Sequence, residues 1–459
     1  MTSTDVVVVL PGIMGSTLRR NGRLVWAPSA GAALRAIATF GQSLKRLQLP
    51  ADIGDEHPGD GVEPVALMPD LHALPGIWSP VRGYDVLLRR LRSLGFSEAG
   101  SHLGAAPGNL LTIPYDWRLS NRHTGAWIAT IVEPALERWR ARGGRFADAQ
   151  LVFVCHSMGG LVARWYIERC GGADITRKLI TFGTPYRGAA KALEQLVNGV
   201  DRRIGPLSLD LTDFARSLPS LHQLLPEYAC IERGEDLLKT TEARIPDLDG
   251  DKIADAMAFH SQLRDAESRR TAGTESTHAI VGVNQATATT ARIVGGRILP
   301  QDNYGADELF GDSTVPLVGA CRSDVPMDAN TLRRVPDKHG NLHRNRAALD
   351  ELEGILTARR IRVRARGTVE LRLDALELAF AGEPIPVGID LSDDIRIALR
   401  IAVTDESGRV VESQMRPRTN GAIAATIGGL AAGAYTIEVG DPDLRVAPVS
   451  ASMLVWPAA

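Results

Sequence analysis

The chain has 459 residues, 44% of them hydrophobic and 23% charged, with a net charge of -2 and a pI near 6.6. This composition is globular, and the length allows one large core plus an appended domain. No basic excess points to nucleic acid, no apolar run reaches the roughly 18 residues of a membrane span, and the N-terminus lacks a signal-peptide pattern. The four cysteines are scattered singly, without metal-ligand spacing. They indicate a reduced, cytoplasmic protein, for which neither a metal nor a cofactor is expected.

The first strand is expected over residues 6–10, because a continuous apolar run is typical of a strand buried on both faces of a parallel sheet. The loop Pro11-Gly12-Ile13-Met14-Gly15-Ser16 follows it. A glycine-bearing loop after an early strand can direct a backbone N–H at an oxyanion. We expect the amide of Ile13 in that role, with Gly12 against the substrate. The alternative interpretation is a plain tight turn.

Residues 27–80 are expected to form a cap or lid insertion; they look irregular and are rich in Pro and Gly around residues 52–64. Within them, residues 32–49 have the spacing of an amphipathic helix, which either docks on the core or lies at a lipid interface as a lid. Residues 84–94 predict a helix that buries Leu87, Leu88 and Leu91.

Residues 109–118 predict a strand ending in a polar turn, and a helix is expected over 127–139. Asp116, Trp117 and Arg118 would then lie at the carboxyl edge of the sheet, where open α/β sheets bind ligands. We expect these three residues to bind substrate. A structural ion pair between Asp116 and Arg118 explains the same pattern equally well.

Residues 151–164 read Leu-Val-Phe-Val-Cys-His-Ser-Met-Gly-Gly-Leu-Val-Ala-Arg, an apolar strand, a sharp turn and a helix. This order is the nucleophile elbow of α/β-hydrolases, in which a serine at the tip of the turn meets a histidine base. Ser157 is the expected nucleophile, and the amide of Met158 is the second oxyanion donor. Cys155 stands where the usual signature has its first Gly. The alternative role for Ser157 is an ordinary helix N-cap.

Strands are expected again over residues 178–185 and 278–283, on either side of a helical insertion at 187–274 that would cap the carboxyl edge of the sheet. Asp312 follows in a tight Gly-Asp-Ser turn, and His339 comes after it. In α/β-hydrolases the nucleophile comes first along the chain, then the acid and then the base, and Ser157, Asp312 and His339 follow this order. His343 is a rival for the base, and spacing alone does not choose between the two histidines.

Six stretches in order resemble the lecithin:cholesterol acyltransferase family: residues 11–16, 114–118, 156–160, 182–185, 311–316 and the segment around His339. The resemblance covers roughly residues 5 to 357. It implies an acyltransferase or phospholipase that acts through an acyl-serine, with Ser157, Asp312 and His339 as the triad. It favours His339 over His343, because the family's histidine lies about ten residues before the first Leu of the terminal helix, here Leu349.

The sequence departs from the family in three places. Cys155 replaces Gly at the elbow, Ser313 replaces the Gly that usually follows the catalytic Asp, and the cysteine pair that closes the lid of secreted members is missing between Trp26 and Trp78. The missing pair agrees with a cytoplasmic, bacterial-type member.

The sequence pattern changes over residues 360–459. Short stretches in which apolar and polar residues alternate are separated by residues typical of turns. They predict an antiparallel immunoglobulin-like β-sandwich without a catalytic constellation. The expected domains are therefore 1–358, an α/β-hydrolase domain with a mostly parallel sheet, helices on both faces and a helical cap, and 360–459, the sandwich.

The function these patterns favour is a serine-dependent lipid acyl hydrolase or acyltransferase. It would meet a lipid or other acyl ester, in some cases at a membrane surface, and pass the acyl group to water or an alcohol. The alternatives are a carboxylesterase acting on small soluble esters and a catalytically inactive interaction protein. Nothing in the sequence indicates what binds the sandwich.

Overall fold

The core of the chain is a parallel sheet. In the computed structural model its strands run in the order β17-β12-β7-β6-β1-β5, and every neighbouring pair is parallel. The strands are β1 (Val6–Leu10), β5 (Leu110–Thr112), β6 (Leu151–His156), β7 (Thr176–Phe182), β12 (Ser276–Val283) and β17 (Arg333–Pro336). β1 and β6 lie inside the sheet and are buried along their whole length, which explains their apolar sequences.

The structure describes residues 4–27, 46–69, 83–99, 107–204, 207–270, 276–305, 307–308, 310–329, 332–357, 369–418, 421–443 and 445–457.

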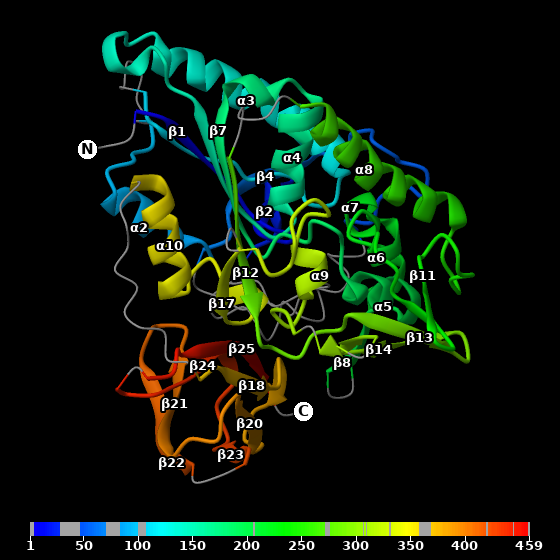
Figure 1. Cartoon of the computed structure of the whole chain (residues 1–459), viewed down its shortest axis with the longest axis vertical. Helices are drawn as coiled ribbons and strands as arrows, with labels where there is room; N and C mark the ends of the chain where they lie inside the picture. The colour runs from blue at the N-terminus through cyan, green and yellow to red at the C-terminus, as the bar shows by residue number, and fades with distance from the viewer. Residues whose placement is uncertain are drawn as a thin grey trace.

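Helices cover both faces of this sheet (Figure 1). α3 and α4 lie on one face with α8 packed against α4, and α2 and α10 lie on the other face. Their bounds are α2 (Asp85–Ser93), α3 (Asn121–Arg140), α4 (Gly159–Arg169), α8 (Gly250–Arg269) and α10 (Arg346–Thr357). Leu87, Leu88 and Leu91 are buried, as their helical spacing predicts. Parallel strands joined by helices on both faces confirm the predicted α/β-hydrolase architecture.

A small antiparallel sheet follows β1, and of its three strands β4 lies in the stretch 27–80 that the sequence predicts to be irregular. Its strands, in the order β3-β2-β4, are β2 (Ser16–Arg20), β3 (Arg23–Trp26) and β4 (Val62–Leu67). The amphipathic helix predicted at 32–49 lies outside the described residues except for its last four positions. Among the helices that are described, none combines the length and the apolar character needed to cross a bilayer.

The insertion between β7 and β12 is not purely helical, in contrast to the prediction. Its elements before α8 are α5 (Ala190–Asn198), β8 (Asp201–Ile204), β9 (Leu207–Asp210), α6 (Thr212–Ser217), α7 (Pro219–His222), β10 (Ile231–Arg233) and β11 (Asp236–Leu238). β10 and β11 join strands beyond the insertion, β13 (Thr290–Val294) and β14 (Arg297–Gln301), in the order β11-β10-β13-β14. β10 and β11 are only three residues long, and the other partner of β10, β13, lies about 60 residues away, so the sequence offers too short a pattern to detect. The short elements η1 (Gly144–Phe146), η2 (Gly172–Ile175), β15 (Asn303–Tyr304), β16 (Asp307–Glu308), α9 (Leu317–Ala320) and η3 (His339–Asn341) complete the domain.

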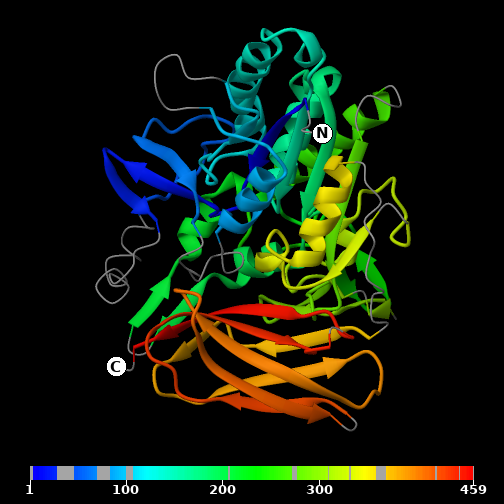
Figure 2. The same cartoon turned by 90° about the vertical axis from the view of Figure 1, so that its left-hand side faces the viewer.

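The C-terminal strands form two facing sheets with a hydrophobic core of their own. They are β18 (Leu371–Ala375), β19 (Leu378–Phe380), β20 (Ile385–Leu391), β21 (Ile397–Asp405), β22 (Val410–Arg418), β23 (Ile423–Ile427), β24 (Gly433–Gly440) and β25 (Val449–Trp456). One sheet has the order β18-β20-β23 and the other β19-β25-β24-β21-β22. The chain changes sheets between β18 and β19, and β19 then pairs in parallel with β25. This is the predicted immunoglobulin-like sandwich, and Figure 2 shows it lying against one end of the α/β domain.

Candidate active site

Ser157 lies at a sharp turn between β6 and α4. Its backbone has φ 52°, a left-handed conformation that non-glycine residues rarely adopt. Two backbone contacts hold the turn: the N–H of Ser157 donates to the Phe182 carbonyl at 2.8 Å, and the Thr184 hydroxyl donates to the Ser157 carbonyl at 2.8 Å. The strained turn lifts the hydroxyl away from the strand, as a nucleophile requires.

Two glycines allow the turn to pack closely against its neighbours. A Cβ on Gly159 would lie 2.4 Å from the Pro11 carbonyl oxygen, and one on Gly160 would lie 2.1 Å from the Thr184 hydroxyl. Cys155, in the place of the usual first Gly, is fully buried within β6. Burial raises the pKa of its thiol well above the ordinary value, so this sulfur is a packing group rather than a reactive one.

Three side chains from distant parts of the sequence form one hydrogen-bonded chain. His339 Nε2 lies 2.8 Å from Ser157 Oγ, and His339 Nδ1 lies 2.7 Å from Asp312 Oδ2. All three side chains are almost fully buried. Because a carboxylate only accepts, Nδ1 carries the ring proton and leaves Nε2 free to accept the serine proton.

The carboxylate of Asp312 is held by its own turn. Its Oδ1 accepts from the N–H groups of Thr314 at 3.0 Å and Val315 at 2.7 Å, which leaves Oδ2 for the histidine. Ser313 has φ 72°, which explains why Gly is usual at this position in the resembled family. The N–H of His339 also donates to the Asp312 carbonyl at 2.7 Å, so the acid and base segments are joined through their backbones as well.

His343, the rival base, occupies a different position. Its Nε2 lies 2.9 Å from the Gly83 carbonyl, and its ring stacks on Tyr84 with centroids 4.6 Å apart. Of the two candidate histidines, His339 is therefore the one within hydrogen-bond distance of both Ser157 and Asp312.

The two expected oxyanion donors flank the serine. Within the described residues, the backbone N–H groups of Ile13 and Met158 have no hydrogen-bond partner. Met158 is the N-cap of α4, where the helix dipole favours negative charge. Gly12 lies so near that a Cβ on it would be 2.8 Å from Ser157 Cβ. These positions suit donors for charge that develops on an oxygen bonded to the carbon attacked by Ser157.

Tyr84 and His156 also belong to this site, and the sequence analysis did not identify them. The Tyr84 hydroxyl accepts from the N–H of Gly12 at 2.8 Å and lies 3.0 Å from His156 Nδ1. His156 Nε2 in turn lies 3.1 Å from the His339 carbonyl. Burial, and then the neighbouring His343 and His339, lower the pKa of His156 well below its ordinary value. The position of His156 next to the serine was the one available signal, and nothing local marks Tyr84.

The three residues expected to bind substrate at the carboxyl edge of the sheet, Asp116, Trp117 and Arg118, are buried. Arg118 is fully enclosed and pairs with Asp116 at 2.6 Å and with Asp60 at 2.9 Å. Burial by itself would raise the pKa of Asp60, but the hydrogen bond and charge of Arg118 bring it below the ordinary value. The Trp117 indole donates to the Ser16 carbonyl at 3.2 Å. Of the two interpretations left open by the sequence, the structure therefore favours the ion pair.

Comparison with known proteins gives a consistent picture over part of the chain. The family model described as lecithin:cholesterol acyltransferase matches residues 97–283, a range that contains Ser157 and ends before Asp312 and His339. The lysosomal phospholipase A and acyltransferase of Homo sapiens is 32% identical over 119 residues, 25% of this chain and 27% of that protein. The Rattus norvegicus protein of the same name is 31% identical over 119 residues, again 25% and 27%. The chain thus spans about a quarter of the length of these curated relatives.

Among solved structures, the Bacillus licheniformis lipase BlEst2 in its propeptide form is 10% identical, covers 98% of this chain and 93% of its own, and has a TM-score of 0.35. That similarity is too weak to bear on function. The family model and the curated relatives name related activities, and the segment that the family model matches contains the nucleophile elbow. Residues 97–283 are therefore similar to the lecithin:cholesterol acyltransferase family.

Proposed function

We propose that this protein cleaves the acyl ester of a lipid through an acyl-serine and passes the acyl group to water or to an alcohol. The observation that carries the proposal is the hydrogen-bonded chain from Ser157 through His339 to Asp312. The similarity of residues 97–283 to the family model supports a lipid ester as substrate, and so do the curated relatives, which are named as phospholipase A and acyltransferase.

In the first half of the reaction, Ser157 Oγ attacks the ester carbonyl carbon while His339 Nε2 takes the hydroxyl proton. The carbonyl oxygen becomes an oxyanion, which the N–H groups of Ile13 and Met158 bind. Asp312 stabilises the charged imidazolium and keeps its orientation. When the carbon–oxygen bond to the leaving alcohol breaks, His339 gives its proton to that oxygen, and an acyl-serine remains.

In the second half, the acceptor hydroxyl, of water or an alcohol, attacks the same carbon. His339 now removes the acceptor's proton and returns it to Ser157 Oγ as the acyl–serine bond breaks. Water gives a free fatty acid and an alcohol gives a new ester, so one site supports both outcomes, and acceptor binding decides between them.

The test is product analysis after incubation with phospholipid vesicles that contain a long-chain alcohol, comparing the parent with Ser157→Ala. We expect Ser157→Ala to lower the rate by a factor on the order of 10⁶. Ser261→Ala is a matched control, because the Ser261 hydroxyl only donates to the Ala258 carbonyl within α8. A fluorophosphonate probe should label the parent and Ser261→Ala and leave Ser157→Ala unlabelled.

The products discriminate between the candidate functions. Fatty acid alone would identify a phospholipase, and acyl transfer to the alcohol would identify an acyltransferase. Turnover of short soluble esters but not of vesicles would identify a carboxylesterase instead. A parent that neither reacts with the probe nor forms product would contradict the proposal and favour an interaction protein.

A further inference from the structure

The two segments that carry Asp312 and His339 both contact the C-terminal sandwich. We call residues 310–315 the acid loop and residues 337–341 the base loop. Each loop is connected to a different strand of the sandwich by side chains that are nearly fully buried, Gln285 for the acid loop and Asp337 and Asn341 for the base loop.

Gln285 connects the acid loop to β18. Its backbone N–H donates to the Gly311 carbonyl at 3.0 Å, and it forms a β-bridge with Asp312. Its side-chain amide spans two backbone groups of the sandwich: Nε2 donates to the Leu371 carbonyl at 3.0 Å, and Oε1 accepts from the Leu373 N–H at 3.3 Å. Because β18 is an edge strand, Gln285 satisfies polar groups that would otherwise lack a strand partner.

Ser450 on β25 makes the equivalent contact with the base loop. Its N–H donates to Asp337 Oδ1 at 3.2 Å, and its carbonyl accepts from Asn341 Nδ2. Asp337 and Asn341 lie two residues before and two residues after His339. The other carboxylate oxygen of Asp337 accepts from Asn345 Nδ2 at 2.8 Å, which fixes the orientation of the carboxylate. The backbone of one sandwich residue therefore holds both ends of the base loop.

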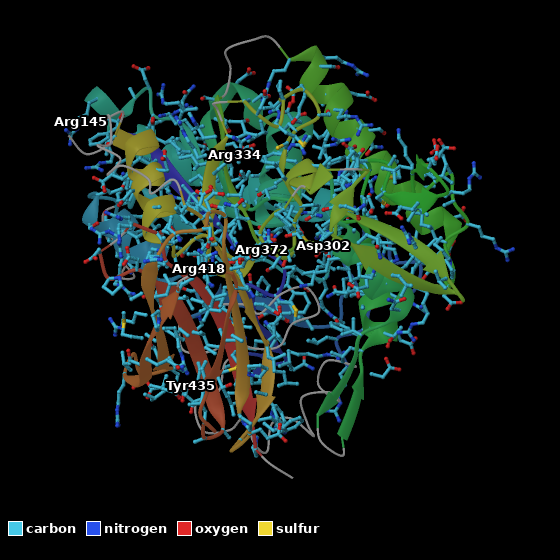
Figure 3. The ribbon with its side chains drawn as sticks, turned by 60° about the horizontal axis from the view of Figure 1, so that its bottom comes forward. Arg145, Asp302, Arg334, Arg372, Arg418 and Tyr435 are labelled. Atoms are coloured by element: carbon cyan, nitrogen blue, oxygen red, sulfur yellow. The ribbon has the colours of Figure 1, made fainter. Side chains whose placement is uncertain are left out.

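A third contact reinforces the acid side. The guanidinium of Arg372, on β18, lies 3.9 Å from the centre of the Phe310 ring, a cation–π arrangement. Figure 3 shows Arg372 where the sandwich meets the α/β domain. Phe310 begins the acid loop, and Arg372 lies between Leu371 and Leu373, so β18 contacts this loop directly as well as through Gln285.

We propose that the sandwich is a positioning element of the active site, which holds the acid and base loops so that Asp312 and His339 keep their alignment with Ser157. The inference rests on the proposed serine chemistry. A module that was merely tethered would not need buried hydrogen bonds to both loops. Displacing a catalytic group by about 1 Å through a distant change can lower a rate by about 100-fold, so the sandwich has direct influence over the chemical step.

The experiment compares the full-length parent with Gln285→Ala, Asn341→Ala and the double variant, using a short water-soluble p-nitrophenyl ester. We expect the double variant to lower kcat by about 10- to 100-fold with KM changed by less than about threefold, since neither substitution changes a residue expected to bind substrate. Fluorophosphonate labelling of Ser157 should slow in parallel. Gln414→Ala is the matched control, because Gln414 Nε2 donates to the Thr426 carbonyl at 3.0 Å within the sandwich and away from both loops.

Thermal unfolding of each variant distinguishes a misfolded protein from a folded one with misplaced catalytic groups. If the double variant unfolds, the single variant Asn341→Ala provides the test instead. A folded double variant with the parental kcat would overturn the inference. So would an equal loss of kcat in Gln414→Ala, which would mean general destabilisation. A parent that fails to react with the probe would instead overturn the proposed function, and this inference with it.

Discussion

The hydroxyl of Tyr84 lies 3.0 Å from Nδ1 of His156, and this contact connects two segments that meet at Ser157. The Tyr84 oxygen accepts from the Gly12 N–H at 2.8 Å, so its own proton is available for His156 Nδ1. His156 Nε2 then carries the ring proton and donates it to the His339 carbonyl at 3.1 Å. This arrangement requires a neutral His156, because Nδ1 must accept a proton rather than donate one. Burial lowers the pKa of His156, which favours the neutral ring. The loop with the expected oxyanion donor and the loop with the expected base are thereby joined.

Tyr84→Phe tests that connection. Removing the hydroxyl leaves the Gly12 N–H and His156 Nδ1 buried without their partner, and each such group costs about 1–3 kcal/mol. We expect kcat to fall by roughly tenfold with KM little changed, because the donor loop loses its alignment. Tyr166→Phe is the control: its hydroxyl donates to Glu133 at 3.3 Å, outside the site. Steady-state kinetics on a soluble ester measure both, and a parental kcat in Tyr84→Phe would contradict the role.

Gly12→Ala tests how closely the oxyanion loop must approach the serine. The new Cβ would lie 2.8 Å from Ser157 Cβ and 3.2 Å from His156 Nδ1, so the loop or the elbow must move. We expect kcat to fall by about 100-fold or more, the effect of losing one oxyanion donor.

Gly250→Ala is the matched control for this change, because a Cβ there meets nothing within 4 Å. It should retain parental activity. Activity in Gly12→Ala close to that of Gly250→Ala would show that the loop tolerates the displacement, and that Ile13 is not held in place by Gly12.

The parts of the structure that were predictable are those with a local signal. Each of these signals lies within a few neighbouring residues, and each predicted its element correctly: the apolar runs of β1 and β6, the glycines after Ser157 and the leucines of α2. Tyr84 lies 72 residues from His156, and no periodicity links them. Spacing also could not distinguish a ligand-binding Arg118 from a buried one, since that depends on Asp60, 58 residues away. The assignment of catalytic roles and the cytoplasmic location stay predictions.

Arg118→Ala distinguishes a structural role from a substrate-binding one. Removing the guanidinium leaves the carboxylates of Asp116 and Asp60 close together without their common partner. Breaking a buried ion pair in this way typically costs about 3–5 kcal/mol. We expect urea unfolding to show that loss, with KM unchanged wherever the variant is folded. Arg19→Ala, which breaks an exposed pair with Glu63, should cost less than about 1 kcal/mol. An increased KM with unaltered stability would instead identify Arg118 as a substrate ligand.

Buried histidines should make the fold sensitive to mild acid. Burial lowers the pKa of His260 to about 3, and it lowers the pKa values of His156 and His222 as well. In the unfolded chain these groups titrate near their ordinary value of about 6.5. Below that pH the unfolded state binds more protons than the folded state, so stability is complete above about pH 6.5 and is lost as the pH falls. The slope is at most about 1.4 kcal/mol per pH unit for each histidine.

Urea unfolding at pH 7.5, 6.0 and 5.0 measures this loss in the parent and in His260→Gln. We expect the variant to show a shallower decline between pH 6.5 and 5, because one of the groups that bind a proton on unfolding is gone. His57→Asn, a change at an exposed position, should follow the parental curve. Equal slopes in the parent and in His260→Gln would mean that the acid sensitivity arises elsewhere. The carboxylates with lowered pKa values, such as Asp324, are a different source, but their contribution is lost only as the pH falls below about 4.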